Sequence, residues 1–155
     1  SFLTSFGICM IAIPSIIKIA EIKHLFDEPC QRKNHLSRTP TLGGVAIFAA
    51  VIFSITFWAD YKVISELKYV ISALIILFFM GLKDDLFNLV AYKKLGAQLL
   101  ASFILVHYAG IRITTFYGLF GVTDLGIIPS YILSVFTIIV ITNSFNLIDG
   151  IDGLA

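Results

Sequence analysis

Five apolar stretches, separated by short polar segments, run along the chain of 155 residues. Each approaches the roughly 17 to 25 apolar residues that a helix needs to cross a bilayer. They predict membrane spans over residues 1–17, 41–59, 67–82, 95–113 and 129–142. No internal repeat or soluble linker separates them. The pattern therefore predicts an all-α fold: a polytopic transmembrane helical bundle of about five spans that forms one integral membrane domain over residues 1–155.

Composition also indicates a membrane protein. Hydrophobic residues make up 58% of the chain and charged residues 14%, whereas soluble domains carry about 25% charged residues. The net charge of +1 gives no basis for binding nucleic acid, and we expect none. Cys9 and Cys30 are expected to be incidental thiols. Because the chain begins at Ser1 and stops at Ala155, soon after a polar motif, we expect it to be an N-terminal fragment of a longer protein.

The basic residues predict an orientation. Eight of the eleven lysines and arginines fall in the loops after the first and third spans, and three fall on the other side. Loops rich in Lys and Arg are characteristically cytoplasmic. We therefore expect the N-terminus to lie outside and the end of the fifth span to face the cytoplasm.

A polar motif follows the fifth span. It places two amides and two carboxylates at three-residue spacing: Asn143, Asn146, Asp149 and Asp152. A carboxylate at mid-bilayer costs about 2.5–3.5 kcal/mol on insertion scales, so these groups must face water, a cation or a ligand. We expect Gly150 and Gly153 to break the helix, so that both carboxylates fold over its end. A capped helix end is the simpler alternative, but acids there oppose the helix dipole. Oxygen ligands of this kind suit Mg²⁺.

Two further polar motifs are expected on the same face. Asp84 and Asp85 follow the third span, and their mutual repulsion near a bilayer favours a cation between them. Lys94 and Gln98 begin the fourth span, where four-residue spacing places them on one helix face. A solvated turn whose carboxylates complement lysines explains the acidic pair equally well.

The remaining motif precedes the second span and contains Arg32, His35, Pro40, Gly43 and Gly44. Pro40 fits the first turn of a helix, and the glycines allow another backbone or a ligand to approach closely. Taken alone, this motif is better explained as a basic flank of a membrane helix.

Together the motifs supply acids for a divalent metal, basic groups for phosphates and glycines for close approach beside a membrane. Phosphoryl transfer needs these elements, and a lipid phosphate with a cytoplasmic anionic donor fits the location. An ion-coupled transporter also places acids at broken helices, but nearer mid-bilayer. A non-catalytic membrane scaffold is the third alternative.

The residues Asn143-Ser-Phe-Asn-Leu-Ile-Asp-Gly-Ile-Asp152-Gly-Leu-Ala resemble the signature of the polyprenyl-phosphate N-acetylhexosamine-1-phosphate transferases, glycosyltransferase family 4. Gly81-Leu-Lys-Asp-Asp85 resembles the acidic pair of that family, and Arg32-Lys-Asn-His35 with Pro40-Thr-Leu-Gly-Gly44 resembles its N-terminal motif. The Arg-Lys-x-His form of this N-terminal motif is most similar to that of the undecaprenyl-phosphate N-acetylglucosamine-1-phosphate transferases. The phospho-N-acetylmuramoyl-pentapeptide transferases of peptidoglycan synthesis are the second choice.

The resemblance implies that undecaprenyl phosphate and a UDP-N-acetylhexosamine react with Mg²⁺, or Mn²⁺ as an alternative, at the bacterial cytoplasmic (inner) membrane. The products would be undecaprenyl-diphospho-N-acetylhexosamine and UMP, in the first lipid-linked step of cell-envelope polysaccharide synthesis such as that of O-antigen. A homodimer and an active site facing the cytoplasm are further expectations.

The resemblance also implies roles for single residues. Asp84 and Asp85 would lie at the reaction centre, and Asp149 and Asp152 would be further catalytic carboxylates that line the nucleotide site together with Asn143. Asn146 would bind the metal and Lys94 the phosphates, and the remaining substrate-binding residues would be Arg32, His35, Gly43 and Gly44. Lys83 departs from the small or apolar residue usual in the family. A further metal-binding Asp and a loop rich in His and Arg would lie beyond Ala155, so we expect residues 1–155 alone to be inactive.

Overall fold

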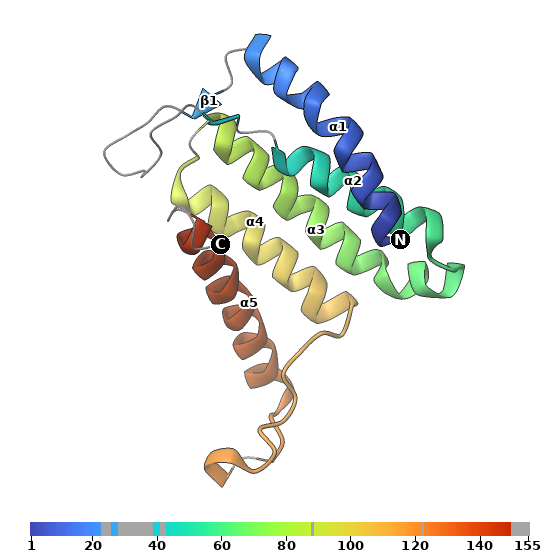
Figure 1. Ribbon diagram of the computed structural model, residues 1–155. Coiled ribbons are helices and arrows are strands. Elements are labelled where there is room, and N and C mark those ends of the chain that lie inside the picture. Colours follow the sequence, from blue (N-terminus) through green and yellow to red (C-terminus); the bar gives the residue numbers. More distant parts are fainter. Residues whose placement is uncertain (23–25, 28–38, 41–42, 88, 122, 150–155) are drawn as a thin grey trace.

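The computed structural model describes residues 1–22, 26–27, 39–40, 43–87, 89–121 and 123–149 (Figure 1). Within these residues the chain forms five α-helices: α1 (Phe2–Ile22), α2 (Gly43–Trp58), α3 (Tyr61–Phe87), α4 (Ala91–Phe103) and α5 (Ile127–Asp149). α4 continues as a π-helical turn, η1 (Ile104–Tyr108), and a 3-10 turn, η2 (Leu119–Gly121), precedes α5. Two short strands, β1 (Phe26–Asp27) and β2 (Thr39–Pro40), pair antiparallel between α1 and α2.

α1 and α2 pack side by side through small residues (Figure 1). Four-residue spacing places the buried residues of α2 on one helix face: Ala46, Ala50 and Ser54. Small side chains let helix backbones approach closely, as is common between membrane helices. Polar bonds hold the end of this pair, because Ser54 Oγ donates to the Ser1 carbonyl at 2.7 Å and Trp58 Nε1 donates to Thr4 Oγ1 at 2.8 Å.

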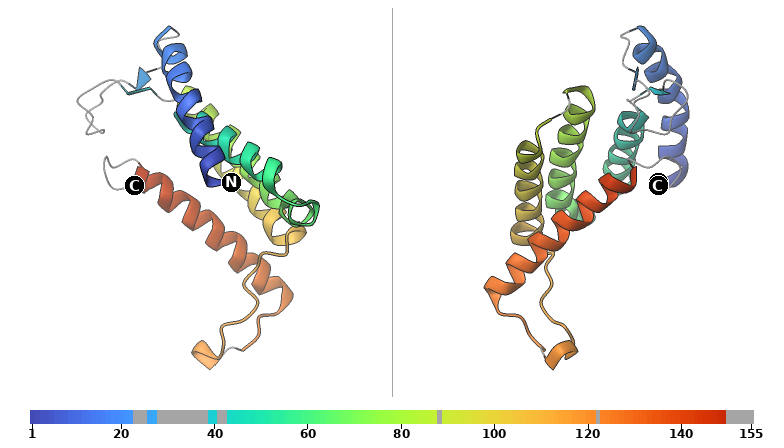
Figure 2. Two further views of the ribbon diagram at one scale, coloured as in Figure 1. Left: turned by 45° about the vertical axis from the view of Figure 1, so that its right-hand side comes forward. Right: turned by 90° about the vertical axis from the view of Figure 1, so that its left-hand side faces the viewer.

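α4 packs between α3 and α5 and also buries small residues. At the N-terminal end of α5, Ser130 Oγ donates to the Ile113 carbonyl at 2.5 Å, and the Ile113 amide donates to Ser134 Oγ at 2.8 Å. The stacked rings of Phe48 and Phe78, whose centroids are 3.9 Å apart, connect α2 with α3. The five helices therefore form one bundle, with α5 crossing it obliquely (Figure 2).

The burial pattern is the reverse of that in a soluble protein. Among the described residues, the buried side chains are mainly alanines and serines, whereas many Phe, Leu and Ile side chains are exposed. In the described ranges, three helical segments are long and apolar enough to cross a membrane: α1, α3 and Ile127–Asn146 within α5. α2 is apolar but has only 16 residues, and α4 has 13. The predicted all-α membrane fold with five helices is confirmed, and three of the five meet the length of a span.

Two predicted span ends are wrong. The fourth span was expected to reach residue 113, but regular α-helix ends at Phe103, the π-helical turn ends at Tyr108, and Gly110 takes a φ of 68°. A left-handed glycine commonly terminates a helix. The fifth helix continues past the predicted span end at Thr142 to Asp149, in agreement with the expectation that the first polar positions of the motif lie on the helix itself.

Other boundaries differ less. α1 continues to Ile22, five residues past the predicted span, and α3 ends at Phe87, which places the acidic pair in its final turns. Pro40 does not occupy the first turn of a helix as predicted: it lies in β2, and α2 begins at Gly43.

Candidate functional site

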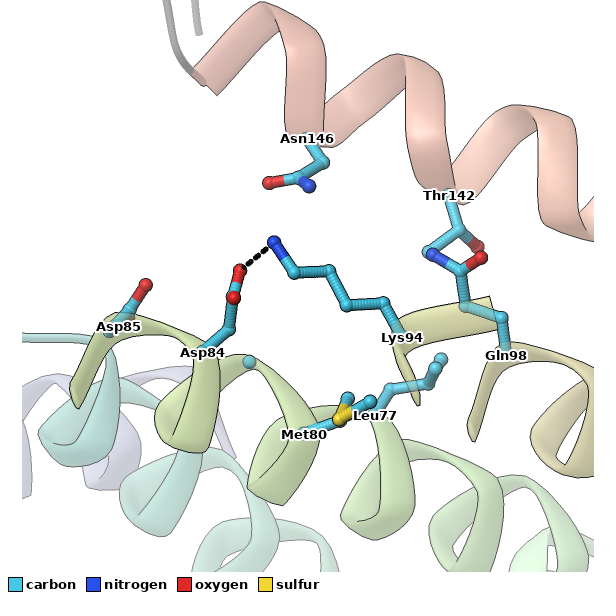
Figure 3. Close-up of a pocket in the computed structure, with 9 residues that line it drawn as sticks. Leu77, Met80, Asp84, Asp85, Lys94, Gln98, Thr142 and Asn146 are labelled. Carbon is cyan, nitrogen blue, oxygen red and sulfur yellow. Dashed lines mark ion pairs between the residues drawn. The ribbon is translucent and has the colours of Figure 1, made fainter. Parts of the chain in front are cut away.

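Three helix ends meet at one end of the bundle: the end of α3, the start of α4 and the end of α5 (Figure 1). They enclose a pocket of about 210 Å³, which we call the α3–α4–α5 pocket. Nine residues line it (Figure 3): Leu77, Met80, Gly81, Asp84, Asp85, Lys94, Gln98, Thr142 and Asn146. The predicted acidic pair, lysine and second asparagine are therefore brought together from three separate segments.

Helical periodicity explains which residues face the pocket. The five lining residues of α3 begin at Leu77 and recur three or four positions apart, so they share one face that is apolar deep in the bundle and acidic at its end. Lys94 and Gln98 on α4, and Thr142 and Asn146 on α5, are each four residues apart and also share a face. The prediction that Lys94 and Gln98 share a face is confirmed.

Both carboxylate oxygens of Asp84 have partners. Oδ2 lies 2.5 Å from Lys94 Nζ, and Oδ1 accepts a hydrogen bond of 2.9 Å from the Leu89 backbone amide. The side chains of Asp84 and Lys94 are 22% and 32% exposed, so the ion pair is partly shielded from water. Asp84 thereby fixes the connection between α3 and α4 and holds the lysine ammonium at the mouth of the pocket.

Asp85 and Asn146 join the Asp84–Lys94 pair in the polar part of the pocket lining, which we call the polar wall. Figure 3 shows the Asn146 amide directed toward the Asp84–Lys94 pair, with Asp85 rising from α3 beside Asp84. Asp85 also lines a second pocket of about 190 Å³, the α2–α3 pocket, together with Gly44 and Gly81. The two adjacent carboxylates therefore have different surroundings, and Asp85 borders both pockets.

The predicted glycines lie at the start of α2. Gly43 is its first residue, and Gly44 lines the α2–α3 pocket. A Cβ atom built on either glycine would meet no other atom of the described residues within 4 Å. Close approach of another part of the chain is therefore not what these glycines permit in the described structure, and their role toward a ligand stays a prediction.

Asn143 does not line the α3–α4–α5 pocket but contacts Gln98 across the α4–α5 interface. The four-residue spacing from Lys94 predicted the correct helix face for Gln98, but no function was predicted for it. Its partner lies 45 residues further along the chain, and no local pattern in the sequence indicates that contact.

Some predicted site residues cannot be placed. Arg32, His35 and Asp152 lie outside the described residues, and so do Gly150 and Gly153, which were expected to break the fifth helix. Asp149 is the last residue of α5, and its side chain is outside what the structure describes. The expectation that Asp149 and Asp152 fold over the helix end stays a prediction.

The donor chemistry of the pocket fits a hard divalent cation. Within the described ranges no cluster of three His, Cys, Asp or Glu side chains could hold a metal by itself. However, the polar wall offers carboxylate oxygens from the acidic pair and the amide oxygen of Asn146. Mg²⁺ is characteristically bound through one or two carboxylates, water and substrate phosphates, so a complete cage of protein ligands is not required.

These features define a helical membrane protein with an acidic and basic pocket at one end of its bundle. A comparison with family models matches residues 67–155 to glycosyl transferase family 4. Because the match covers more than half of the chain, the protein belongs to this family.

Curated relatives agree with the family. The chain is 30% identical over 154 residues to the undecaprenyl-phosphate alpha-N-acetylglucosaminyl 1-phosphate transferase of Yersinia pestis, covering 99% of the chain and 40% of that protein. It is 28% identical over 138 residues to the protein of the same name in Escherichia coli strain K12, covering 88% of the chain and 37% of the relative. A Bacillus subtilis strain 168 protein named "Probable undecaprenyl-phosphate N-acetylglucosaminyl 1-phosphate transferase" is 33% identical over 157 residues. This match covers 100% of the chain and 43% of that protein.

The chain thus spans about two fifths of the length of these relatives. No solved structure matches it.

Proposed function

We propose that the complete protein transfers N-acetylglucosamine 1-phosphate from its UDP-sugar to undecaprenyl phosphate and releases UMP, as the first lipid-linked step of a cell-envelope polysaccharide. The observation that carries this proposal is the meeting of Asp84, Asp85, Lys94 and Asn146 in one pocket at the end of a membrane bundle. The names of the relatives support the lipid acceptor and the sugar, and none of those reported names a pentapeptide substrate.

The reaction needs one bond to form and one to break. An oxygen of the lipid phosphate attacks the β-phosphorus of the UDP-sugar, the bond between that phosphorus and the bridging oxygen breaks, and UMP leaves with the bonding electrons. The acceptor oxygen is already anionic near neutral pH, so the main tasks of the protein are alignment and charge compensation.

The residues of the pocket suit these tasks. The Lys94 ammonium, held by Asp84, would bind the diphosphate of the donor and compensate the charge that develops on UMP. Asp85 and Asn146 would hold Mg²⁺, which when bound would supply further charge compensation between the two substrates. Apolar residues of α3 such as Leu77 form another part of the pocket lining.

Direct attack by the lipid phosphate is preferred over a covalent intermediate on Asp84. Both Asp84 oxygens are engaged, one by an ammonium and one by a backbone amide. A carboxylate in this position would have to break two contacts before it could attack phosphorus. Asp84 is therefore better suited to positioning Lys94 than to acting as a nucleophile.

The test uses the complete reading frame, purified and reconstituted with undecaprenyl phosphate, UDP-[³H]GlcNAc and Mg²⁺. We expect label to enter the butanol phase, and we expect EDTA, Asp84→Asn and Asn146→Ala each to lower that rate at least a hundredfold. Ser144→Ala is the matched control, since among the described residues its hydroxyl bonds only the Val140 carbonyl of its own helix. Failure to label lipid with this or any other UDP-sugar, with no UMP released, would reject the transferase.

We also propose that the pocket faces the cytoplasm of the bacterial inner membrane, as the distribution of basic residues favours. Cys9 and Cys30 are first replaced by Ser, and single cysteines are then introduced at Asp85 and at Tyr117 in the connection before α5. Tyr117 is 94% exposed and serves as the marker of the opposite side. A membrane-impermeant maleimide added to intact cells should label position 117 and spare position 85, and the reverse pattern would invert the orientation.

A further inference from the structure

Gln98 and Asn143 form a reciprocal pair of hydrogen bonds between α4 and α5. Gln98 Nε2 donates to Asn143 Oδ1 at 3.2 Å, and Asn143 Nδ2 donates to Gln98 Oε1 at 3.1 Å. Asn143 Nδ2 also donates to the Ile139 carbonyl at 3.0 Å, which uses both of its N–H groups. Gln98 is 9% exposed and buried between the helices, whereas Asn143 is exposed, so the pair lies at the edge of the α4–α5 interface.

The amide pair stands one helical turn away from two residues of the α3–α4–α5 pocket. Lys94 precedes Gln98 by four positions on α4, and Asn146 follows Asn143 by three positions on α5. Because side chains three or four residues apart are neighbours on a helix, the pair adjoins Lys94 on one helix and Asn146 on the other. Any sliding or rotation of α5 against α4 would break the pair and move Asn146 relative to Lys94.

The other polar contacts of α5 with preceding segments lie far from the pocket. One of them joins His107 Nδ1 and the Tyr131 hydroxyl at 3.2 Å. Ser130 and Ser134 bind the backbone of Ile113 near the opposite end of the helix. Between the amide pair and the start of α5, the buried residues of the α4–α5 interface are apolar or small. Such residues fix the distance between the two helices better than the rotation or register of one helix against the other. The amide pair is therefore the feature best placed to set the register at the pocket.

We propose that Gln98 and Asn143 are positioning residues that hold Asn146 in register with the Asp84–Lys94 pair. This inference rests on the proposed transferase function and assigns Asn143 a role different from the nucleotide contact that its place in the motif implies. A displacement of about 1 Å among groups that align a reaction can lower the rate by about a hundredfold. Loss of the amide pair should therefore act mainly on kcat.

A double-mutant cycle of the complete protein tests this role. Gln98→Ala and Asn143→Ala should each lower kcat about ten- to a hundredfold and change the KM for UDP-GlcNAc less than threefold. The double variant should be no slower than the slower single variant, because each change removes the same pair. If Asn143 instead contacts the nucleotide, Asn143→Ala alone should raise that KM and the two effects should multiply, which would overturn the proposal.

Rescue separates positioning from a general loss of packing. The exchange of Gln98→Asn together with Asn143→Gln keeps the combined length of the two side chains and allows the reciprocal bonds to re-form. It should restore kcat at least tenfold over the slower of its two single exchanges, whereas no recovery counts against the proposal. Ser144→Ala, one residue from Asn143 but bonded within its own helix, should leave both constants unchanged.

Wild-type activity and thermal unfolding of the same variants in detergent together distinguish failure of this proposal from failure of the proposed function. If wild-type protein shows no transfer with any UDP-sugar, the transferase reading fails, and the positioning proposal, which depends on it, fails with it. If wild-type protein is active, the Tm losses of the two alanine variants should be non-additive and should be recovered by the exchange. Additive losses in an active protein would show that the pair is not coupled and would overturn the inference alone.

Discussion

The contacts of Asp84 allow its two oxygens to be tested separately. Asp84→Asn keeps an oxygen that can accept from the Leu89 amide but removes the negative charge facing Lys94. Ion pairs that remain in contact with water contribute about 0.2–1 kcal/mol, and at 22% and 32% exposure this pair belongs near that range. The free energy of unfolding should therefore fall by about 1 kcal/mol or less.

Asp84→Ala removes both contacts. A hydrogen bond to a charged group contributes about 1.5–3 kcal/mol, so this variant should lose about 2–4 kcal/mol in total. The Ala and Asn variants differ in the hydrogen bond to the Leu89 amide, which in Asp84→Asn has a neutral acceptor and contributes about 0.5–1.5 kcal/mol. Lys94→Met, which removes only the ion pair, should resemble Asp84→Asn in stability.

Thermal unfolding of the complete protein in detergent, followed by tryptophan fluorescence or circular dichroism, ranks these variants. Salt separates the two contacts: raising KCl from about 0.05 to 0.5 M screens an exposed ion pair and should shrink the Tm difference between wild type and Asp84→Asn. The further loss in Asp84→Ala should persist at high salt. Equal Tm values for the Asn and Ala variants would refute the assignment of the second oxygen to the Leu89 amide.

Three other changes have distinct outcomes. Gly81→Leu should abolish transfer without lowering Tm, because Gly81 lines both pockets and a Cβ there meets no described atom within 4 Å, whereas Gly81→Ala should retain activity. Ala50→Leu should lower stability by about 1–3 kcal/mol by overpacking the α1–α2 interface, while Val51→Leu on the exposed face should be neutral in Tm. Ser134→Ala should lower stability by about 1–3 kcal/mol, measured as Tm, because it leaves the Ile113 amide without its acceptor.

Each change has a contradicting result. A Gly81→Leu variant with wild-type kcat would show that substrates do not occupy the two pockets. Equal Tm values for the variants at positions 50 and 51 would mean that α1 and α2 do not pack through small residues. Ser72→Ala is the control for the serine variant, since the Ser72 side chain bonds only the Lys68 carbonyl of its own helix within the described part of the chain, and it should stay within about 0.5 kcal/mol of wild type.

Sequence alone predicted the helices well and their ends less well. Apolar runs indicate where helices lie because lipid favours long apolar segments, but they do not show where polar residues continue a helix. α5 extends through Asn143 and Ser144, whose side chains find hydrogen-bond acceptors on carbonyls of the preceding turn, at Ile139 and Val140. Hydropathy counts those residues as breaks.

The candidate site was predictable in its members but not in its internal contacts. Motif order indicated that Asp84, Asp85, Lys94 and Asn146 belong together, and helical spacing placed Lys94 beside Gln98. The division of the acidic pair, with Asp84 bound to Lys94 and Asp85 bordering a second pocket, depends on how α2, α3 and α4 pack. The same is true of the contact between Gln98 and Asn143.

The Asp84–Lys94 pair also bears on how the bundle assembles in the membrane. Its partners lie only ten residues apart, on either side of the connection between α3 and α4. The pair can therefore form within this hairpin in the membrane without any contribution from α5. The pocket is completed when the later helix docks against a hairpin whose charges already compensate each other.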